Sequence, residues 1–174
     1  MISIFLGSGT KEKTFTKGIS PGNLAPEIHL QGIDLTNDKY VLIQFWAAYD
    51  GESRKQNALL NNKISRTELD NLQVISISFD EKKSVFQQAV KADKLDISNQ
   101  YNVEAGRTSE IYKNYRLDKG FGNFLINPNG IIIAHNIDPE QVIKMLKTKS
   151  VWYTLKLLKM PESWFIQLSG IFFI

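Results

Sequence analysis

The segment from Tyr40 to Ile64 constrains the fold more than any other part of the chain. It begins with a run of β-branched, aromatic and aliphatic residues, Tyr40–Trp46, that contains one glutamine. A run of this kind, preceded by turn residues, predicts a buried strand that is covered on both faces. Asp50 and Gly51 then lead into a polar stretch with helical character, residues 52–64. A strand, a short loop and a helix in this order predict an α/β domain whose functional edge lies at the loop.

The sequence of this junction resembles the active-site segment of thioredoxin-like proteins of the TlpA/ResA type, which are related to AhpC/TSA proteins. That family has Phe-Trp-Ala-x-Trp-Cys-x-x-Cys-Arg, and this chain has Phe-Trp-Ala-Ala-Tyr-Asp-Gly-Glu-Ser-Arg at residues 45–54. The positions of the two cysteines hold Asp50 and Ser53, and the chain contains no cysteine. The resemblance extends over about residues 20–148 and implies a thioredoxin-like α/β fold, with a central mixed sheet flanked by helices.

Thiol-disulfide exchange is excluded by the absence of sulfur, although the family is one of oxidoreductases. In the family's motif the first cysteine attacks a disulfide as a thiolate, stabilised by the helix N-terminus, and the second cysteine resolves the mixed disulfide. Asp50 cannot form a mixed disulfide, and Ser53 cannot resolve one. Peroxidase activity of the peroxiredoxin kind is excluded for the same reason, so no residue is assigned a catalytic role.

Asp50 has a structural interpretation of its own. Aspartate is a preferred N-cap because its carboxylate accepts N–H groups of the first helical turn, and Ser53 stands where it can bond back to the cap. The alternative, a general acid/base or a metal ligand, requires a partner, and only Glu52 lies nearby in the sequence. His29 and His135 both fall in predicted strands, where each is expected to be structural. We therefore expect no cofactor and no metal.

Two further segments match other parts of the family pattern. Residues 22–30 resemble its Gly-x-x-Ala-Pro-x-Phe-x-Leu phrase, and Pro26 suits the start of an edge strand because proline donates no ladder hydrogen bond. Residues 72–79 alternate between two faces and predict a strand parallel to the first, joined to it by a right-handed crossover. Asp80 follows this strand and is expected to cap a helix over about residues 82–91.

A second functional element of the family is also replaced. Residues 116–127 match a phrase in which a cis-proline packs beside the two cysteines and presents backbone groups to a bound thiol substrate. Phe121 stands at the proline position. A cis bond before a residue other than proline costs roughly 3 kcal/mol, so we expect a trans bond and a remodelled loop with Gly120 and Gly122 on either side. Asn-Pro-Asn-Gly at residues 127–130 predicts a turn between two strands, and Asp-Pro at 138–139 predicts a helix start.

The chain divides into three parts. Residues 1–19 are a leader-like or tether segment, residues 20–149 the thioredoxin-like domain, and residues 150–174 an apolar extension that holds two of the three tryptophans. The start resembles the end of a bacterial lipoprotein leader, with Thr10 where the cysteine would come; the alternative is a frayed terminus. The extension is too short to span a bilayer. It packs on the core, contacts a membrane surface or a partner, or is a non-native addition; these three readings stay open.

The charge of the chain argues against nucleic acid as a partner. The formal net charge is +3, from 21 basic and 18 acidic residues, and the basic residues form no patch. The leading interpretation is a redox-inactive module of the bacterial periplasm or envelope, otherwise of the cytoplasm, that binds a protein or peptide at the former active-site face. Its predicted binding residues are Trp46, Tyr49, Asp50 and Phe121. The alternatives are a decayed oxidoreductase relative without activity and an enzyme of another class that uses Asp50.

Overall fold

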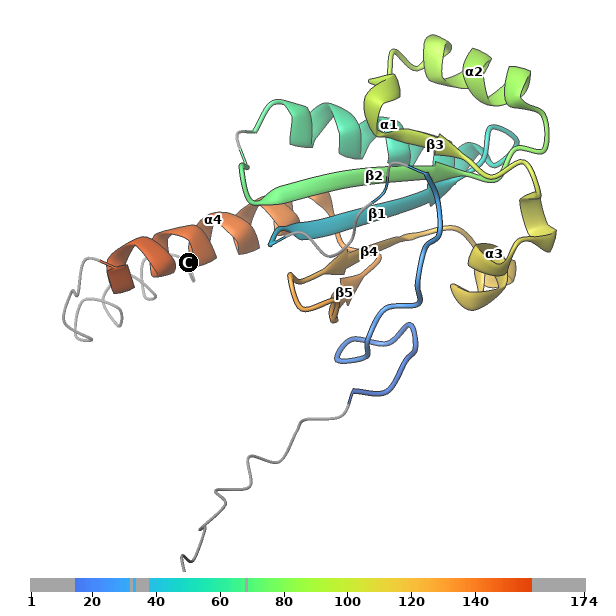
Figure 1. Cartoon of the computed structure of the whole chain (residues 1–174). Coiled ribbons are helices and arrows are strands. Elements are labelled where there is room, and N and C mark those ends of the chain that lie inside the picture. The colour runs from blue at the N-terminus through green and yellow to red at the C-terminus, as the bar shows by residue number, and fades with distance from the viewer. Residues whose placement is uncertain (1–14, 32, 34–37, 68, 158–174) are drawn as a thin grey trace, which may run out of the picture.

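The computed structural model describes residues 15–31, 33, 38–67 and 69–157, and its strands form one mixed sheet in the order β3-β2-β1-β4-β5 (Figure 1). The strands are β1 Tyr40–Trp46, β2 Leu72–Ser78, β3 Gln100–Asn102, β4 Asn123–Ile126 and β5 Ile132–His135. β1, β2 and β3 are parallel, whereas β4 and β5 are antiparallel to their neighbours. This mixed sheet flanked by helices confirms the predicted thioredoxin-like fold.

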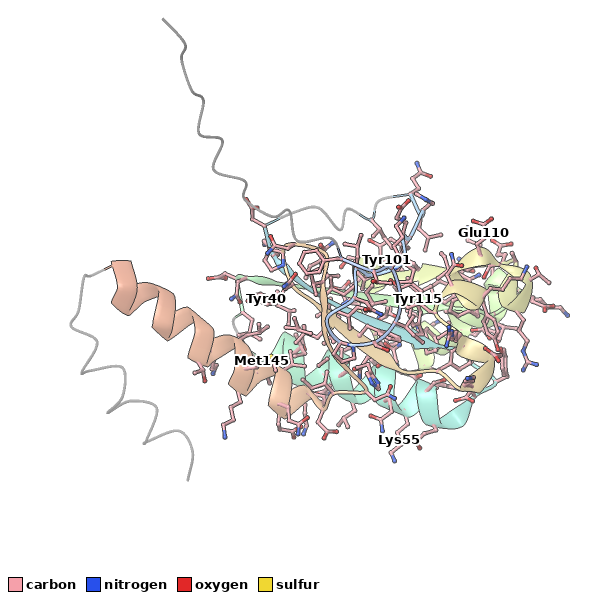
Figure 2. The ribbon with its side chains drawn as sticks, turned by 90° about the horizontal axis from the view of Figure 1, so that it is seen from below. Tyr40, Lys55, Tyr101, Glu110, Tyr115 and Met145 are labelled. Carbon is pink, nitrogen blue, oxygen red and sulfur yellow. The ribbon has the colours of Figure 1, made fainter. Side chains whose placement is uncertain are left out.

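Helices cover both faces of the sheet (Figure 1). The α-helices are α1 Gly51–Ser65, α2 Lys83–Ala92, α3 Glu110–Asn114 and α4 Pro139–Leu157, and single 3-10 turns occur at η1 Ile97–Asn99, η2 Gly106–Thr108 and η3 Leu117–Lys119. The last turns of α4 extend past the end of the sheet, away from the end at which Glu110 lies (Figure 2). α4 thus continues through the predicted boundary at residue 149. No helix in the described ranges is both long and apolar enough to cross a membrane.

The central strand β1 organises the core because all of its residues are buried. Its odd-numbered side chains, such as Phe45, pack with α3 and with the segment around Ile28 on one face. On the other face, the side chains in the first half of the strand, such as Leu42, pack with α1 and α4. Burial on both faces explains why the strand is a nearly continuous apolar run in the sequence.

The segment that contains Pro26 differs from the prediction. It forms no strand; backbone pairing is confined to isolated bridges from Leu24 to Lys17 and to Ile131. His29 therefore lies outside any strand, and its side chain is 80% exposed. The segment runs over the sheet as a strap, held by burial of Ile28 and by a hydrogen bond from the Tyr115 hydroxyl to the Pro26 carbonyl, 2.8 Å long. His135 does lie in a strand, β5, as predicted.

The structure describes only part of the two predicted terminal segments, residues 1–19 and 150–174. The leader-like residues 1–14 and the apolar residues 158–174 lie outside the described residues. Within the described part, backbone hydrogen bonds join Thr16 and Gly18 to Leu24, so the folded part begins before residue 20.

Candidate functional site

Asp50 and Ser53, which stand at the two cysteine positions, join the loop after β1 to the first turn of α1 by hydrogen bonds. The Asp50 carboxylate accepts the Ser53 backbone N–H at 2.8 Å, which makes Asp50 the N-cap of α1. The Ser53 hydroxyl donates to the Asp50 carbonyl at 3.2 Å and accepts the Ala47 N–H at 3.3 Å. The predicted cap is confirmed, and both side chains serve the geometry of the helix start.

The carboxylate of Asp80 fixes the same loop from the neighbouring strand. Asp80 is 3% exposed and accepts the Ala48 backbone N–H with Oδ1 and Oδ2, at 3.1 and 3.0 Å. The Ser78 hydroxyl donates to Oδ2 at 2.7 Å. The prediction that Asp80 caps α2 is therefore wrong: α2 begins at Lys83, its N-cap residue is Lys82, and no side chain caps it.

Tyr49 lies at the tip of this fixed loop. Its side chain is 56% exposed although it is aromatic, and its ring centroid lies 6.3 Å from that of Phe121. The guanidinium carbon of Arg107 lies 5.6 Å from the Tyr49 ring centroid, a distance at which a cation is attracted to the ring face. The Tyr49 side chain raises the pKa of Arg107 above its usual value, first by hydrogen bonding and then by charge.

Phe121, at the family's proline position, is part of an aromatic cluster. Its ring stacks on Phe79 with centroids 5.9 Å apart and an interplanar angle of 19°, and it meets Tyr112 edge-on at 6.2 Å. All peptide bonds in the described ranges are trans, as expected for this position. Gly120 has φ +121°, a conformation that only glycine adopts readily. The Phe121 ring therefore lies beside Tyr49 and is supported by Phe79 and Tyr112.

Trp46 lies beneath this face rather than on it. Its side chain is fully buried and packs on Phe86, with ring centroids 6.1 Å apart. Its place among the predicted contact residues therefore needs correction, because a side chain with no exposed surface cannot contact a partner directly. Trp46 is the last residue of β1, and residues of α2 cover its side chain. The structure brings Tyr49, Asp50 and Phe121 together at the surface, where the loop after β1 meets the loop before β4.

Sequence reasoning missed the residues that surround Tyr49. A cleft of about 460 Å³ lies beside it, and its lining includes Lys82, Val85 and Arg107. We refer to it as the Tyr49 cleft. Val85 is 40% exposed, so the cleft contains uncovered apolar surface on α2 as well as on the loop. Arg107 belongs to η2, and nothing in the local sequence indicates its place, because the chain between β3 and α3 reads as irregular.

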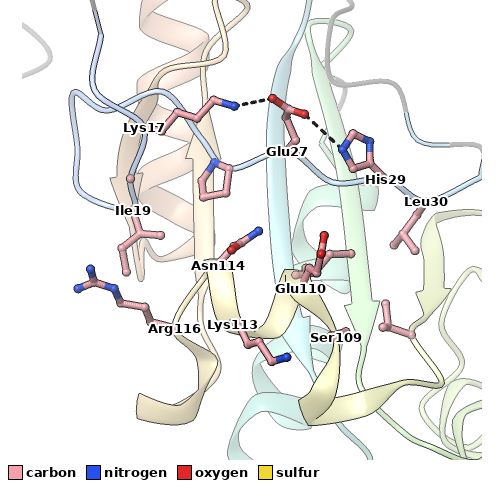
Figure 3. Close-up of a pocket in the computed structure, with 14 residues that line it drawn as sticks. Lys17, Ile19, Glu27, His29, Leu30, Ser109, Glu110, Lys113, Asn114 and Arg116 are labelled. Atoms are coloured by element: carbon pink, nitrogen blue, oxygen red, sulfur yellow. Dashed lines mark hydrogen bonds and ion pairs between the residues drawn. The ribbon is translucent and has the colours of Figure 1, made fainter.

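A larger cleft, of about 730 Å³, lies between the strap and α3 (Figure 3). Above it, Glu27 accepts a hydrogen bond from Lys17 at 2.6 Å and lies 3.2 Å from the His29 ring nitrogen. The pKa of Glu27 lies below its usual value, chiefly because Lys17 donates this hydrogen bond to its carboxylate. These exposed charges already satisfy one another, and none of the predicted site residues lines the cleft. Elsewhere in the described ranges, no three His, Asp or Glu side chains gather where they could hold a metal ion.

Known structures resemble the chain over most of its length. A thioredoxin-like protein from Parabacteroides distasonis is 47% identical, with 77% of this chain and 99% of that chain covered and a TM-score of 0.73. A thiol-disulfide oxidoreductase from Bacteroides fragilis is 27% identical, with 67% of this chain and 85% of that chain covered and a TM-score of 0.54. The thioredoxin domain of a thiol-disulfide oxidoreductase from Bacteroides vulgatus is 23% identical, and the match covers 74% of this chain and 99% of that one with a TM-score of 0.61. No family model and no curated protein matches the chain.

Proposed function

This chain belongs to the thioredoxin-like family and has no cysteine, and from these two facts we infer that it binds a protein or peptide instead of exchanging disulfides. The observation that carries the proposal is the exposure of Tyr49, 56%, on a loop that a buried carboxylate and a helix cap hold in place. Exposed aromatic side chains on a rigid support are the usual anchors of protein interfaces, because they bury a large area with little loss of side-chain freedom.

The loop that carries Phe121 supports the same proposal. Phe121 is half-buried and packs against Phe79, Tyr112 and Tyr49. The aromatic face, formed by Tyr49 and Phe121, is therefore held in place by the packed core of the domain. The face has Arg107 at its margin, and aromatic residues together with arginine are enriched at interfaces. A partner would contact Tyr49, the exposed part of Phe121 and the partly exposed Asp50 beside them.

We propose that this binding takes place in the periplasm or envelope of a bacterium. The bacterial sources of the similar structures support a bacterial origin, and the thiol-disulfide oxidoreductase among them supports an oxidising compartment such as the periplasm. The alternative function is that of a decayed oxidoreductase relative with no binding activity. The alternative location is the cytoplasm.

Site-specific photo-crosslinking tests the binding function. A photo-reactive residue replaces Tyr49 in one variant and Ile97 in a control, because the two side chains have similar exposure, 56% and 58%, and Ile97 lies beyond the far end of α2. We expect one recurrent product from the Tyr49 position and none from the Ile97 position. The captured protein, once purified, should bind the unmodified chain and bind Phe121→Ala more weakly. Equal or diffuse capture at both positions would favour the decayed relative.

A further inference from the structure

We infer that the Tyr49 cleft binds a carboxylate that is attached to an apolar group, such as the end of a peptide or an acidic residue next to an apolar one. This inference rests on the proposed function and specifies its ligand. It depends on two properties of the cleft, its exposed apolar surface and the exposed guanidinium of Arg107, which forms no ion pair within the described residues.

The apolar property comes from three elements that meet at the cleft. Tyr49 lies on the loop after β1, Phe79 directly follows β2, and Val85 belongs to α2. Tyr49 and Val85 remain 56% and 40% exposed, whereas Phe79 is buried beneath them. A cleft of about 460 Å³ falls in the range of sites that hold a small ligand or a few residues of a peptide.

The exposed side chains of the cleft carry two cations and one carboxylate, although the buried Asp80 brings the formal charge of the whole lining to zero. Arg107 lies over the Tyr49 ring and forms no ion pair with any carboxylate in the described ranges. Lys82 is a second exposed cation in the lining. Of the two acidic residues, Asp80 is buried and bonded to Ala48 and Ser78, which leaves Glu81 as the exposed negative charge.

Glu81 lies near enough for its charge to act on Arg107, but the two side chains form no ion pair. A Cβ placed on Gly106 would lie 2.9 Å from Glu81 Cγ and 3.3 Å from its Oε1, so the stem and the carboxylate of Glu81 both pack against the η2 turn. Arg107, the next residue of that turn, has its planar donor groups over Tyr49 at the cleft. A guanidinium presents paired N–H donors that match a carboxylate, and the aromatic ring beside it suits an apolar neighbour of that carboxylate.

Four acetylated peptides of equal length test the inference in titrations with the full chain. The first ends in leucine with a free carboxylate, and the second has the same sequence with a terminal carboxamide. The third has a carboxamide end and a glutamate next to an internal leucine, and the fourth replaces that glutamate with glutamine. The first and second peptides report on a C-terminal carboxylate, whereas the third and fourth report on an acidic side chain.

We expect at least one acidic peptide to bind more tightly than its neutral twin, by roughly threefold to tenfold, the range for a charged hydrogen bond at an accessible site. Arg107→Gln should abolish the difference between the twins, and Glu81→Gln should increase it. Arg66→Gln serves as the matched control because Arg66 is exposed at the opposite end of α1. Arg107 is exposed as well, so its variant should fold normally, and circular dichroism checks this.

Equal affinity for both members of each pair would overturn the inference. If that equal binding disappears in Tyr49→Ala, a peptide site exists and the proposed function stands without the carboxylate preference. If no peptide binds the unmodified chain, the inference is overturned, and the crosslinking experiment decides the proposed function independently.

Discussion

Asp80, two residues after the end of β2, accepts the backbone N–H of Ala48 with both carboxylate oxygens, at 3.1 and 3.0 Å. The two residues are 32 positions apart, and they meet because β1 and β2 are parallel and end at the same edge of the sheet. Ala48 immediately precedes the exposed Tyr49. A buried charge therefore fixes the orientation of the surface residue on which the proposed function depends.

Asp80→Asn should destabilise the protein by about 1–3 kcal/mol, because the amide accepts with only one oxygen and turns a donor toward Ala48 or Ser78. Urea unfolding followed by circular dichroism measures the free energy of unfolding. Asp118→Asn is the control, since Asp118 is exposed on η3. Equal stability of Asp80→Asn and the unmodified chain would show that this carboxylate does not hold the loop.

The local part of the site could be predicted from the sequence, whereas the long-range part could not. The strand β1 and the cap formed by Asp50 depend on residues within a few positions of one another, so pattern and cap preference were sufficient. Asp80 looked equally like a cap, because aspartate before a helical pattern has that preference. It faces Ala48 instead, because β1 and β2 are directly paired and end side by side. The sequence predicted that the two strands are parallel, but not which side chain joins the loops that follow them.

The strap and the Tyr49 cleft also depend on long-range contacts that the sequence does not predict. Pro26 indicates an edge strand, but the strap is fixed by the distant Tyr115 hydroxyl and by burial of Ile28. Arg107 carried no recognisable signal because its importance comes only from its position over Tyr49. The expectation that Tyr49 and Phe121 meet did hold, and it came from the family's arrangement of its two loops rather than from local preferences.

Phe121→Ala and Tyr49→Ala should separate stability from binding. Phe121 is half-buried and contacts Phe79 and Tyr112, so its truncation should cost about 1–3 kcal/mol of unfolding free energy. Tyr49 is more than half exposed, so its truncation should cost less than about 1 kcal/mol while removing the contact surface. Chemical denaturation of both variants checks the order. The reverse order would mean that Tyr49 is a structural residue of the fold.

Gly120→Ala should destabilise the Phe121 loop by about 1–3 kcal/mol through backbone strain alone. An added Cβ would meet no atom within 4 Å, but φ is +121°, in a region that side chains rarely adopt. Gly51→Ala is the matched control, because it also has open space around it and its φ is not positive. Thermal unfolding of the two variants compares them, and equal melting temperatures would show that the loop relaxes without cost.

Tyr115 should make stability fall at high pH. Burial raises the pKa of its hydroxyl well above the usual value of about 10. Below pH ~10 both states keep the proton, whereas above it the unfolded chain releases the proton that the folded chain retains. The free energy of unfolding should therefore decrease by up to about 1.4 kcal/mol per pH unit above that point.

Tyr115→Phe isolates this effect. It loses the hydrogen bond to the Pro26 carbonyl, which should cost about 1 kcal/mol at neutral pH, but it has no proton to release at this position. Its stability deficit should therefore shrink above pH ~10. Urea unfolding of both proteins from pH 8 to pH 11 is the measurement, with the pH range set by the ordinary tyrosine pKa of about 10. Parallel pH profiles would mean that the Tyr115 hydroxyl titrates equally in both states.

Restoring the two cysteines tests how much of the redox scaffold remains. Asp50→Cys with Ser53→Cys should give a single intramolecular disulfide, because the two positions flank the first turn of α1 and the chain offers no competing thiol. The helix N-terminus should lower the pKa of the thiol at position 50, since it stabilises the thiolate. The loss of the Asp50 cap should cost about 1 kcal/mol. Redox titration with glutathione and reduction of a disulfide substrate measure the outcome, with each single variant as a control.

The double variant should exchange disulfides slowly, because Phe121 and Tyr49 lie against each other where the family presents a proline to the substrate. Adding Phe121→Pro should increase the rate, and adding Tyr49→Trp should restore the aromatic residue that the family has before its first cysteine. A double variant that is already as fast as the one with Phe121→Pro would show that Phe121 is no barrier to a disulfide substrate. A double variant that folds but forms no disulfide would place the obstacle in the buried position of Ser53, which is 4% exposed, rather than in the Phe121 loop.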